Sequence, residues 1–335
     1  MVADVRELEA LLSEPTAVTR EVLAATEGDV VVLGAGGKMG PTLAMLLRRA
    51  APDKTVYAVS RFSDAEARSR IEAKGIETIT ADLLDESSYA SLPDVPNVFF
   101  LAGMKFGATG QQPLTWAMNV HLPALVAKHY KDARIVALST GNVYPFMPIT
   151  SGGVCEDDPP GPVGEYAQSC LGRERMFEYF SQVHGTPVTL IRLNYANEPR
   201  YGIIVDLAQK ILAGQPIDVT MGAVNLIWQG DANNYIASAL RLAASPPTIL
   251  NVTGPETIRV RDLAKRIGKL LDKEPTFVSQ EAETALLSNA SRSFSEFGLP
   301  ATNLDAMIER IVPWVAAGKT VLNKPTKFGV RDGKF

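Results

Sequence analysis

The apolar run DVVVLG at residues 29–34 leads directly into the glycine-rich segment GAGGKMG at residues 34–40. A continuous apolar run predicts a strand buried on both faces, as in a parallel sheet. The glycines allow a tight turn and a close approach of the backbone to phosphate groups, and a helix is expected from Pro41. Strand, glycine turn and helix together predict a dinucleotide-binding loop, with a merely structural turn as the alternative. A phosphate-cleaving P-loop is excluded, because Met39 follows Lys38 at the position where such a loop needs Ser or Thr.

Strands and helices alternate through the first two thirds of the chain, with short links between them. Alternation of this kind predicts an α/β fold with a doubly wound parallel Rossmann sheet. Further buried strands are expected at 54–60, 77–80, 97–103, 134–139 and 187–193. Helices are expected at 41–49, 64–74, 113–130 and 166–184.

The rhythm of strands and helices loosens after about residue 195, which suggests three regions. Residues 1–28 are expected to form an N-terminal extension of two short helices, split at Glu14-Pro15 and with Thr16 capping the second. Residues 29–194 are expected to form the dinucleotide-binding domain. Residues 195–335 are expected to form a smaller mixed α/β substrate-binding region, with a cleft between the two in one compact body.

Composition excludes several classes of function. The formal net charge of −4 does not favour a nucleic-acid binder, and no apolar run approaches the roughly 18 to 20 residues of a membrane span. The acidic N-terminus does not resemble a signal peptide, and two cysteines provide no disulfide framework. The three histidines lack metal-ligand spacing, so no metal is expected. The sequence predicts a soluble cytoplasmic enzyme with a small-molecule substrate and neither a nucleic-acid nor a membrane partner.

The end of the second predicted strand bears on which dinucleotide is bound. Ser60 and Arg61 lie about 20 residues after Gly40, where an NAD site usually places a carboxylate for the ribose hydroxyls. A hydroxyl and an arginine can bind a 2′-phosphate, so NADP is favoured over NAD. If Arg61 is only a solvated surface cation, NAD remains the alternative.

An ordered series of motifs resembles the extended short-chain dehydrogenase/reductase superfamily, in particular its NAD-dependent epimerase/dehydratase family. The resemblance covers about residues 29 to 270. Its motifs, in chain order, are GAGGKMG (34–40), ADLLD (81–85), FLAG (100–103), Asn119, LSTGNVYP (138–145), Tyr166 with Glu174, LIRLNYANEP (190–199), Asp231 and NVTGPE (251–256).

The resemblance implies roles for individual residues. Tyr166 is implied as the general acid/base, and Thr140 as the hydroxyl that hydrogen-bonds the reacting oxygen. The expected cofactor-binding residues are Gly34, Gly36, Gly37, Lys38, Met39, Gly40, Ser60, Arg61, Asp82, Leu83, Leu101, Ala102, Gly103, Asn119 and Tyr166.

Most members of this family carry a lysine four residues after the tyrosine, whose charge stabilises the phenolate, and here that residue is Cys170. A free tyrosine has a pKa near 10 and is a poor base at neutral pH. Three readings remain open. Arg173 or Lys105 supplies the missing charge as a further catalytic residue; or Tyr166 only aligns the substrate; or the protein binds a dinucleotide without catalysis and serves as a sensor or partner protein.

Two departures from the family pattern bear on the substrate. Val224 occupies the position of an arginine that binds the diphosphate of nucleotide sugars, and Gly141 and Asn142 replace the Asp-Glu pair of dehydratases. These departures favour a smaller hydroxyl or carbonyl compound, such as a sugar, sugar acid or polyol. The expected substrate contacts are Asn142, Asn194, Asn197 and Arg200, each with simple loop solvation as the alternative.

The helices at 113–130 and 166–184 carry more apolar residues than the sheet face requires, among them Met176, Phe177 and Phe180. In the family such helices pair across a dimer. A homodimer through these two helices is therefore expected, and burial of all these residues in the core is the alternative.

Overall fold

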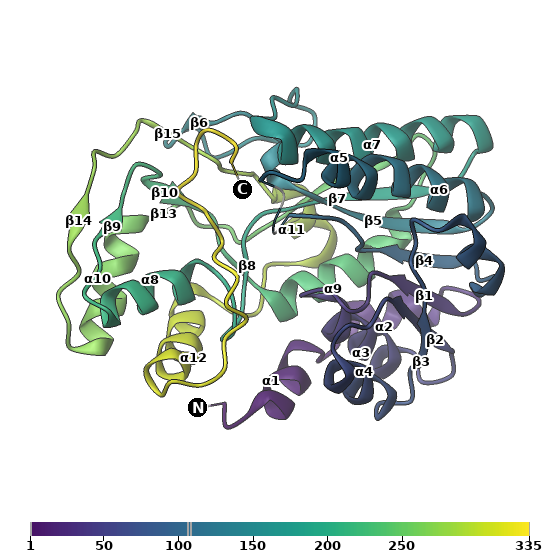
Figure 1. Cartoon of the computed structure of the whole chain (residues 1–335), viewed down its shortest axis with the longest axis horizontal. Helices are drawn as coiled ribbons and strands as arrows, with labels where there is room; N and C mark the ends of the chain where they lie inside the picture. The colour runs from purple at the N-terminus through teal and green to yellow at the C-terminus, as the bar shows by residue number, and fades with distance from the viewer. Residues whose placement is uncertain (1, 106, 108, 335) are drawn as a thin grey trace.

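A seven-stranded parallel sheet forms the centre of the computed structural model, which describes residues 2–105, 107 and 109–334 (Figure 1). The strand order is β12-β7-β5-β4-β1-β2-β3, and every pair of neighbours is parallel. The predicted doubly wound sheet is thereby confirmed. Its strands are β1 (Val30–Leu33), β2 (Val56–Ser60), β3 (Glu77–Thr80), β4 (Asn97–Phe100), β5 (Arg134–Thr140), β7 (Val188–Leu193) and β12 (Thr248–Val252).

Helices cover both faces of the sheet, and the alternation of side chains along β1 shows how. Val30 and Val32 pack in one core cluster with α2, α3, α4 and α9, whereas Val31 and Leu33 pack in another with α6 and α7. Successive side chains of a strand point to opposite faces, so an all-apolar strand must be covered on both. The bounds are α2 (Ala17–Ala24), α3 (Gly40–Ala50), α4 (Ala65–Glu72), α5 (Gln112–Trp116), α6 (Leu122–His129), α7 (Gly164–His184) and α9 (Gln229–Ser238).

The helical stretch predicted at 113–130 is divided in the structure. A π-helical segment, Ala117–His121, lies between α5 and α6 and contains Asn119. Such a wide turn re-aims a side chain, and this kind of segment is frequent at functional sites. Short 3₁₀ turns complete the helical elements at Glu86–Ser91, Gly141–Val143 and Ala239–Leu242.

The N-terminal extension forms α1 (Val5–Leu12) and α2, with Thr16 as the N-cap of α2, as predicted. Both helices attach to α9. The Thr19 hydroxyl donates to Asn234 Oδ1 at 2.7 Å, and Asn233 Nδ2 donates to the carbonyl of Leu12 at 3.0 Å. The extension is thus part of the packed body.

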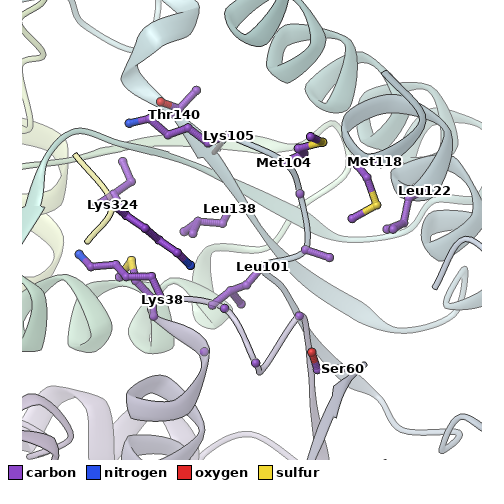
Figure 2. Close-up of a pocket in the computed structure, with 18 of the residues that line it drawn as sticks. Lys38, Ser60, Leu101, Met104, Lys105, Met118, Leu122, Leu138, Thr140 and Lys324 are labelled. Atoms are coloured by element: carbon purple, nitrogen blue, oxygen red, sulfur yellow. The ribbon is translucent and has the colours of Figure 1, made fainter. Parts of the chain in front are cut away.

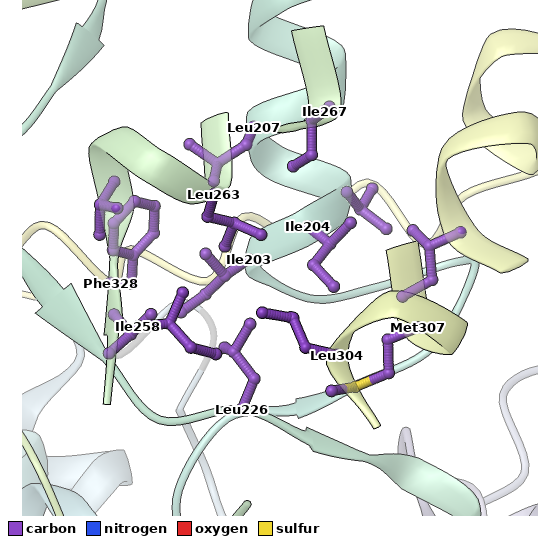
Figure 3. Packing of buried hydrophobic residues seen from close by; sticks show 14 of the residues in the cluster. Ile203, Ile204, Leu207, Leu226, Ile258, Leu263, Ile267, Leu304, Met307 and Phe328 are labelled. Atoms are coloured by element: carbon purple, nitrogen blue, oxygen red, sulfur yellow. The ribbon is translucent and has the colours of Figure 1, made fainter. Parts of the chain in front are cut away.

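The C-terminal region packs around α8 (Ile203–Leu212), α10 (Val260–Leu271) and α12 (Leu304–Ala316). Figure 3 shows Ile204, Leu263 and Met307 from these three helices meeting in its core. The other elements are the strand pairs β6 (Met147–Pro148) with β15 (Thr284–Ala285), β8 (Ala196–Asn197) with β11 (Ile227–Trp228), β9 (Ile217–Asp218) with β14 (Phe277–Val278) and β10 (Ala223–Val224) with β13 (Ile258–Arg259), and helix α11 (Ser291–Phe297).

The two larger regions share more structure than a boundary at residue 194 implies. Strand β12, expected within the smaller region, pairs with β7 from Thr248–Thr189 to Val252–Leu193 and ends the central sheet. Helix α9 also packs on the sheet face in the same core cluster as β1. The sequence pattern misses this because a strand of five residues does not say which sheet it joins.

The last residues of the chain cross the molecule as an extended tail, drawn in yellow in Figure 1. The amide of Leu322 donates to the carbonyl of Arg200 at 2.9 Å. The amide and hydroxyl of Thr326 donate to Asp206 at 2.9 and 2.6 Å, and Arg331 donates to Thr284 at 2.7 and 2.6 Å. Residues 319–334, called the C-terminal tail below, are therefore fixed along α8 and β15.

Within the described residues, no helix is both long enough and apolar enough to span a membrane.

Candidate active site

A cavity of about 710 Å³ opens where the strands of the central sheet end (Figure 2). Its lining comes from the residues that follow β1, β2, β3, β4, β5 and β7, together with α7 and the C-terminal tail. The carboxyl ends of parallel strands are where α/β folds bind ligands, because the strand order reverses there and leaves a crevice. The cavity thus occupies the position expected for a dinucleotide and its substrate.

The glycine loop lines one side of this cavity, and its geometry is possible only because glycine has no side chain. Gly34 has a φ of +90°, and a Cβ there would lie 2.6 Å from the amide nitrogen of Ala102. A Cβ at Gly40 would lie 2.5 Å from the carbonyl of Ala35. Helix α3 then begins at Gly40 with no side chain capping it among the described residues. The loop leaves an uncapped helix N-terminus facing a cavity, which fits a phosphate group.

The neighbouring strands β2 and β3 supply the residues expected near the adenosine. Ser60 and Arg61 line the cavity after β2, and Asp82 and Leu83 line it after β3. Asp64 lines the cavity as well, and its carboxylate caps α4 by accepting from the amide of Ala67 at 3.0 Å. An acidic side chain thus lies near Arg61, which the sequence interpretation did not anticipate.

Tyr166 and Thr140 meet in the cavity, Tyr166 from the first turns of α7 and Thr140 from the end of β5. The Tyr166 phenol hydrogen-bonds the side chains of Thr140 and Cys170. Burial is the main cause of a pKa for Tyr166 well above its usual value, and the Cys170 sulfur adds to this shift. Asn142 Nδ2 donates to Thr140 Oγ1 at 3.0 Å and so orients the hydroxyl.

Arg173 opposes that rise in the pKa of Tyr166. Its guanidinium lowers the pKa of the Tyr166 phenol, as does the hydrogen bond from Thr140. The guanidinium is held by donating to the carbonyl of Leu138 at 2.6 Å and to Asn119 Oδ1 at 2.7 Å. A Cβ at Gly103 would lie 2.1 Å from Arg173 Nη2, so the guanidinium packs directly against that glycine.

Lys105 also approaches the Tyr166 phenol. Its Nζ lies 5.9 Å from the centre of the Tyr166 ring, and it lines the cavity from the loop after β4. Burial lowers the pKa of Lys105 to about 8, with Cys170 and Asp206 acting in the opposite direction. The structure therefore places two cationic side chains around Tyr166, on different elements.

Most of the predicted site residues line the cavity together. They are Gly34, Gly36, Gly37, Lys38, Met39, Gly40, Ser60, Arg61, Asp82, Leu83, Leu101, Ala102, Gly103, Lys105, Thr140, Asn142, Tyr166, Arg173 and Asn194.

Three predicted residues are not brought to the cavity. Asn119 is fully buried behind the loop after β4, where its side chain bonds the backbone N–H and C=O of Met104 at 2.8 and 2.9 Å. Asn197 Nδ2 donates to the carbonyl of Tyr195 at 2.6 Å, and Arg200 pairs with Glu198 at 3.1 Å. The polar groups of these three residues bond other parts of the protein, and none of the three lines the cavity.

The sequence interpretation assigned no role to the C-terminal tail, yet Lys324 and Thr326 line the cavity. Their local sequence, LNKPTKFG, carries no motif, and tertiary packing alone brings it there. Two atoms in the site have no hydrogen-bond partner among the described residues, namely Arg173 Nε and Asn194 Nδ2, although both are buried. Buried donors are usually satisfied, so these two fit contacts to bound molecules.

The described residues hold no group of three or more His, Cys, Asp or Glu side chains arranged to bind a metal ion. Cys155 is exposed and Cys170 buried, and neither forms a disulfide in the described part of the chain.

The parallel sheet, the glycine loop at its first strand and the tyrosine in the adjoining cavity define an extended short-chain dehydrogenase/reductase. The chain belongs to the NAD dependent epimerase/dehydratase family, whose model matches residues 30–232, more than half of its length. It is thus an enzyme of the extended short-chain type.

Solved structures of low sequence identity share this fold. UDP-glucuronic acid 4-epimerase from Bacillus cereus, in complex with NAD, is 18% identical with a TM-score of 0.73, and the match covers 86% of this chain and 99% of that chain. dTDP-glucose 4,6-dehydratase from Bacillus anthracis, in complex with NAD, is 15% identical with a TM-score of 0.75, covering 87% and 97%. UDP-glucose 4-epimerase from Thermotoga maritima is 16% identical with a TM-score of 0.73, covering 87% and 99%. No curated protein sequence matches the chain.

Proposed function

We propose that this enzyme moves a hydride between a nicotinamide dinucleotide and a small polar hydroxyl or carbonyl compound, with Tyr166 as the general acid/base. An epimerase that works through a transient ketone is a close variant. The observation that carries the proposal is that the Tyr166 phenol, hydrogen-bonded to Thr140, opens into the same cavity as the glycine loop.

The side chains around the cavity suit such a reaction. When bound, the cofactor supplies or accepts the hydride. Thr140 hydrogen-bonds the substrate oxygen, and Tyr166 takes the hydroxyl proton during oxidation or returns it during reduction. Asn142 holds the Thr140 hydroxyl through its 3.0 Å hydrogen bond, and Asn194 Nδ2 is left to donate to the substrate.

Arg173 replaces the charge of the missing lysine in this proposal. The guanidinium lies under Gly103 and lowers the pKa of Tyr166, so it favours the phenolate that a base needs. Its Nε has no partner among the described residues and fits a hydroxyl of the cofactor's ribose. Lys105, 5.9 Å from the centre of the Tyr166 ring, adds a second positive charge.

The cofactor is proposed to be NADP. Ser60 and Arg61 offer a hydroxyl and a guanidinium after β2, both of which suit a 2′-phosphate. Asp64 lies nearby, but its carboxylate is used as the cap of α4, accepting from the Ala67 amide. NAD, which is bound in several solved structures of similar fold, is the alternative cofactor.

The substrate is proposed to be a sugar, sugar acid or polyol. The solved structures of similar fold include complexes with UDP-glucose and UDP-glucuronic acid, which supports a carbohydrate. Val224 is fully buried and apolar at the position where nucleotide-sugar enzymes carry an arginine, so a diphosphate is not favoured.

A homodimer is proposed through the outer faces of α5 and α7, which expose Leu114, Trp116, Tyr179 and Val183. Phe177 was expected on this surface, but it is fully buried and packs on Phe100 with ring centres 5.3 Å apart. Phe177 is therefore apolar because it packs in the core, and it does not contribute to the proposed dimer surface.

A dinucleotide-binding protein without catalysis is the second candidate. The observation that favours it is Cys170, whose buried thiol raises the pKa of Tyr166 where a lysine would lower it.

One experiment separates the two candidates. Purified protein is supplied with NADPH or NADP and a panel of aldoses, sugar acids, polyols and aldehydes, and absorbance at 340 nm is followed. Turnover that is lost by at least about 100-fold in Tyr166→Phe supports the enzyme, because general acid–base catalysis contributes on this order. Turnover that survives in Tyr166→Phe contradicts the role of this tyrosine, and cofactor binding without any turnover favours the second candidate.

A further inference from the structure

Three lysines from distant parts of the sequence line the same cavity (Figure 2). Lys38 comes from the glycine loop, Lys105 from the loop after β4, and Lys324 from the C-terminal tail. No sequence motif places these three together. Lys324 joins the other two because the tail is fixed to α8 through Asp206.

The lysines lie on the side of the cavity where the substrate is proposed to react. Lys38 Nζ donates to the carbonyl of Ala196 at 2.8 Å and lies 4.3 Å from the centre of the Tyr201 ring. Both of those residues follow β7 and line the cavity themselves. Lys105 Nζ lies near the Tyr166 ring. Lys105 is thus the member of the cluster that lies beside the Tyr166 phenol.

The carboxylates that line the cavity lie elsewhere. They are Asp64 and Asp82, which follow β2 and β3, the two strands at the far edge of the sheet. Glu198 and Asp206 act on the lysines electrostatically from outside the lining, and each has its own partners. Glu198 accepts from Arg200 Nε at 3.1 Å, and Asp206 accepts from Thr326.

We infer that the substrate carries an anionic group, a carboxylate or a phosphate, which the ammonium groups of Lys38, Lys105 and Lys324 bind while its hydroxyl or carbonyl carbon lies at Tyr166. This inference rests on the proposed function and narrows its substrate class. Three lysines that line one cavity give it a positive potential, which attracts an anionic group more strongly than a neutral sugar.

The titration of the lysines supports the inference. Burial lowers the pKa of Lys38 to about 7 and that of Lys105 to about 8, and Lys105 further lowers the pKa of Lys38. The groups facing Lys38 are Glu198, Arg200 and Lys105, and those facing Lys105 are Cys170, Asp206 and Lys327. An anion binds the protonated lysines, so its affinity is full below pH 7 and falls as the pH rises through 7 to 8.

The test measures anion binding to protein saturated with NADP, so that the glycine loop is already filled. Isothermal titration calorimetry is run with inorganic phosphate, glucose 6-phosphate, gluconate and glucose at pH 6.5 and pH 9. At least one anion is expected to bind tenfold or more tightly than glucose at pH 6.5, and to lose most of that advantage at pH 9. Comparing the affinities of inorganic phosphate and glucose 6-phosphate with that of gluconate shows whether the site prefers a phosphate or a carboxylate.

Variants connect the binding to the cluster. Lys105→Met and Lys324→Met are each expected to weaken binding of the anion by about 3- to 30-fold, because a charge-assisted hydrogen bond is lost. Lys105→Arg and Lys324→Arg should retain more affinity than the methionine variants. Lys269→Met removes an exposed lysine of α10 as the matched control and should change nothing.

Anions that bind no better than glucose, or that bind equally to the methionine variants, overturn the inference. Phosphate binding that disappears once NADP is present also overturns it, because the phosphate then occupies the dinucleotide site. The proposed function has a separate readout in the NADP titration itself. If NADP binds and the anions do not, the substrate class alone is wrong.

Discussion

In the proposed reaction, Cys170 changes how Tyr166 is activated. Where a lysine would lower the pKa of the phenol, a buried thiol raises it, and Arg173 acts against that rise from one turn further along α7. Because Arg173 is tied to Leu138 and Asn119, its charge is fixed in place before any ligand arrives. A preorganised charge costs no rearrangement during the reaction.

Replacing Arg173 should change the pH dependence of the reaction. Arg173→Met removes a charge that lowers the pKa of Tyr166, so the pKa rises further and the phenolate forms at higher pH. In the oxidising direction, which needs the phenolate, the acid limb of the kcat profile should move to higher pH. Arg173→Lys is the control and should keep the limb nearer its original position. A lower kcat with an unmoved limb in Arg173→Met would contradict the electrostatic role.

Arg61 should determine the preference between cofactors. Arg61→Ala removes a guanidinium that lines the cavity after β2, and a charge-assisted contact to a 2′-phosphate is lost. The dissociation constant of NADPH is expected to rise by about 10-fold or more, while that of NADH stays within about twofold. Fluorescence titration with both cofactors measures this. Equal changes for the two would remove the case for NADP.

At the scale of elements, the N-terminal helices are held to α9 by polar contacts inside the protein. Thr19 is fully buried, and its hydroxyl bonds Asn234 Oδ1 at 2.7 Å and Ser238 Oγ at 3.1 Å. Thr19→Val should lower the free energy of unfolding by about 1–3 kcal/mol, because buried polar groups lose a partner. Urea denaturation measures the change. Thr320→Val, at an exposed position of the tail, is the control, and an equal loss there would contradict the prediction.

The elements also show what a sequence pattern can reveal. The sheet strands β1, β2, β3, β4, β5 and β7 are predictable because each is a short local run bounded by turn residues, whereas the two-residue strand β6 is not predicted. The glycine loop is predictable because its glycines are needed where backbone approaches backbone. The predicted boundary at residue 194 does not separate the central sheet from the C-terminal region, because β12 lies beyond that residue and pairs with β7 of the sheet.

Much of the site follows from the resemblance, but contacts made across the fold do not. Asn119 has a motif position, yet its side chain is used by Met104 and Arg173. Lys324 has no motif and still reaches the cavity, because hydrogen bonds to Arg200 and Asp206 fix the tail on either side of it. Such placement depends on residues far apart in the chain.

At the scale of the whole molecule, the first residues of the chain contact the beginning of the C-terminal tail. Lys319 Nζ donates to the carbonyls of Val2 and Ala3 at 2.7 and 2.8 Å, so the first residues and the tail are joined beside α12. The tail then runs past the cavity to the start of α7, where Gly333 lies so close to Gly164 that a Cβ on either would clash. The C-terminal tail thus helps to shape the site.

The proposed homodimer belongs to the same scale. Tyr179 and Val183 are 57% and 55% exposed on α7, an unusual exposure for large apolar side chains. Light scattering coupled to size exclusion should give twice the chain mass of 36.1 kDa. Tyr179→Glu with Val183→Glu should shift the protein toward the monomer, whereas Leu299→Glu, at an exposed position away from α7, should not. A monomeric wild type contradicts the proposal.

The turn after β1 is proposed to bind a pyridine dinucleotide, and calorimetric titration of the whole protein with NADPH and NADH measures that binding. We expect one binding site per chain and tighter binding of NADPH. We also expect Gly36→Val to weaken binding by about 10-fold or more, because a Cβ there would lie 2.6 Å from Ser60 Oγ and intrude on the loop. Absence of measurable binding by either nucleotide, or unchanged binding in a Gly36→Val protein that remains folded, would contradict the proposal.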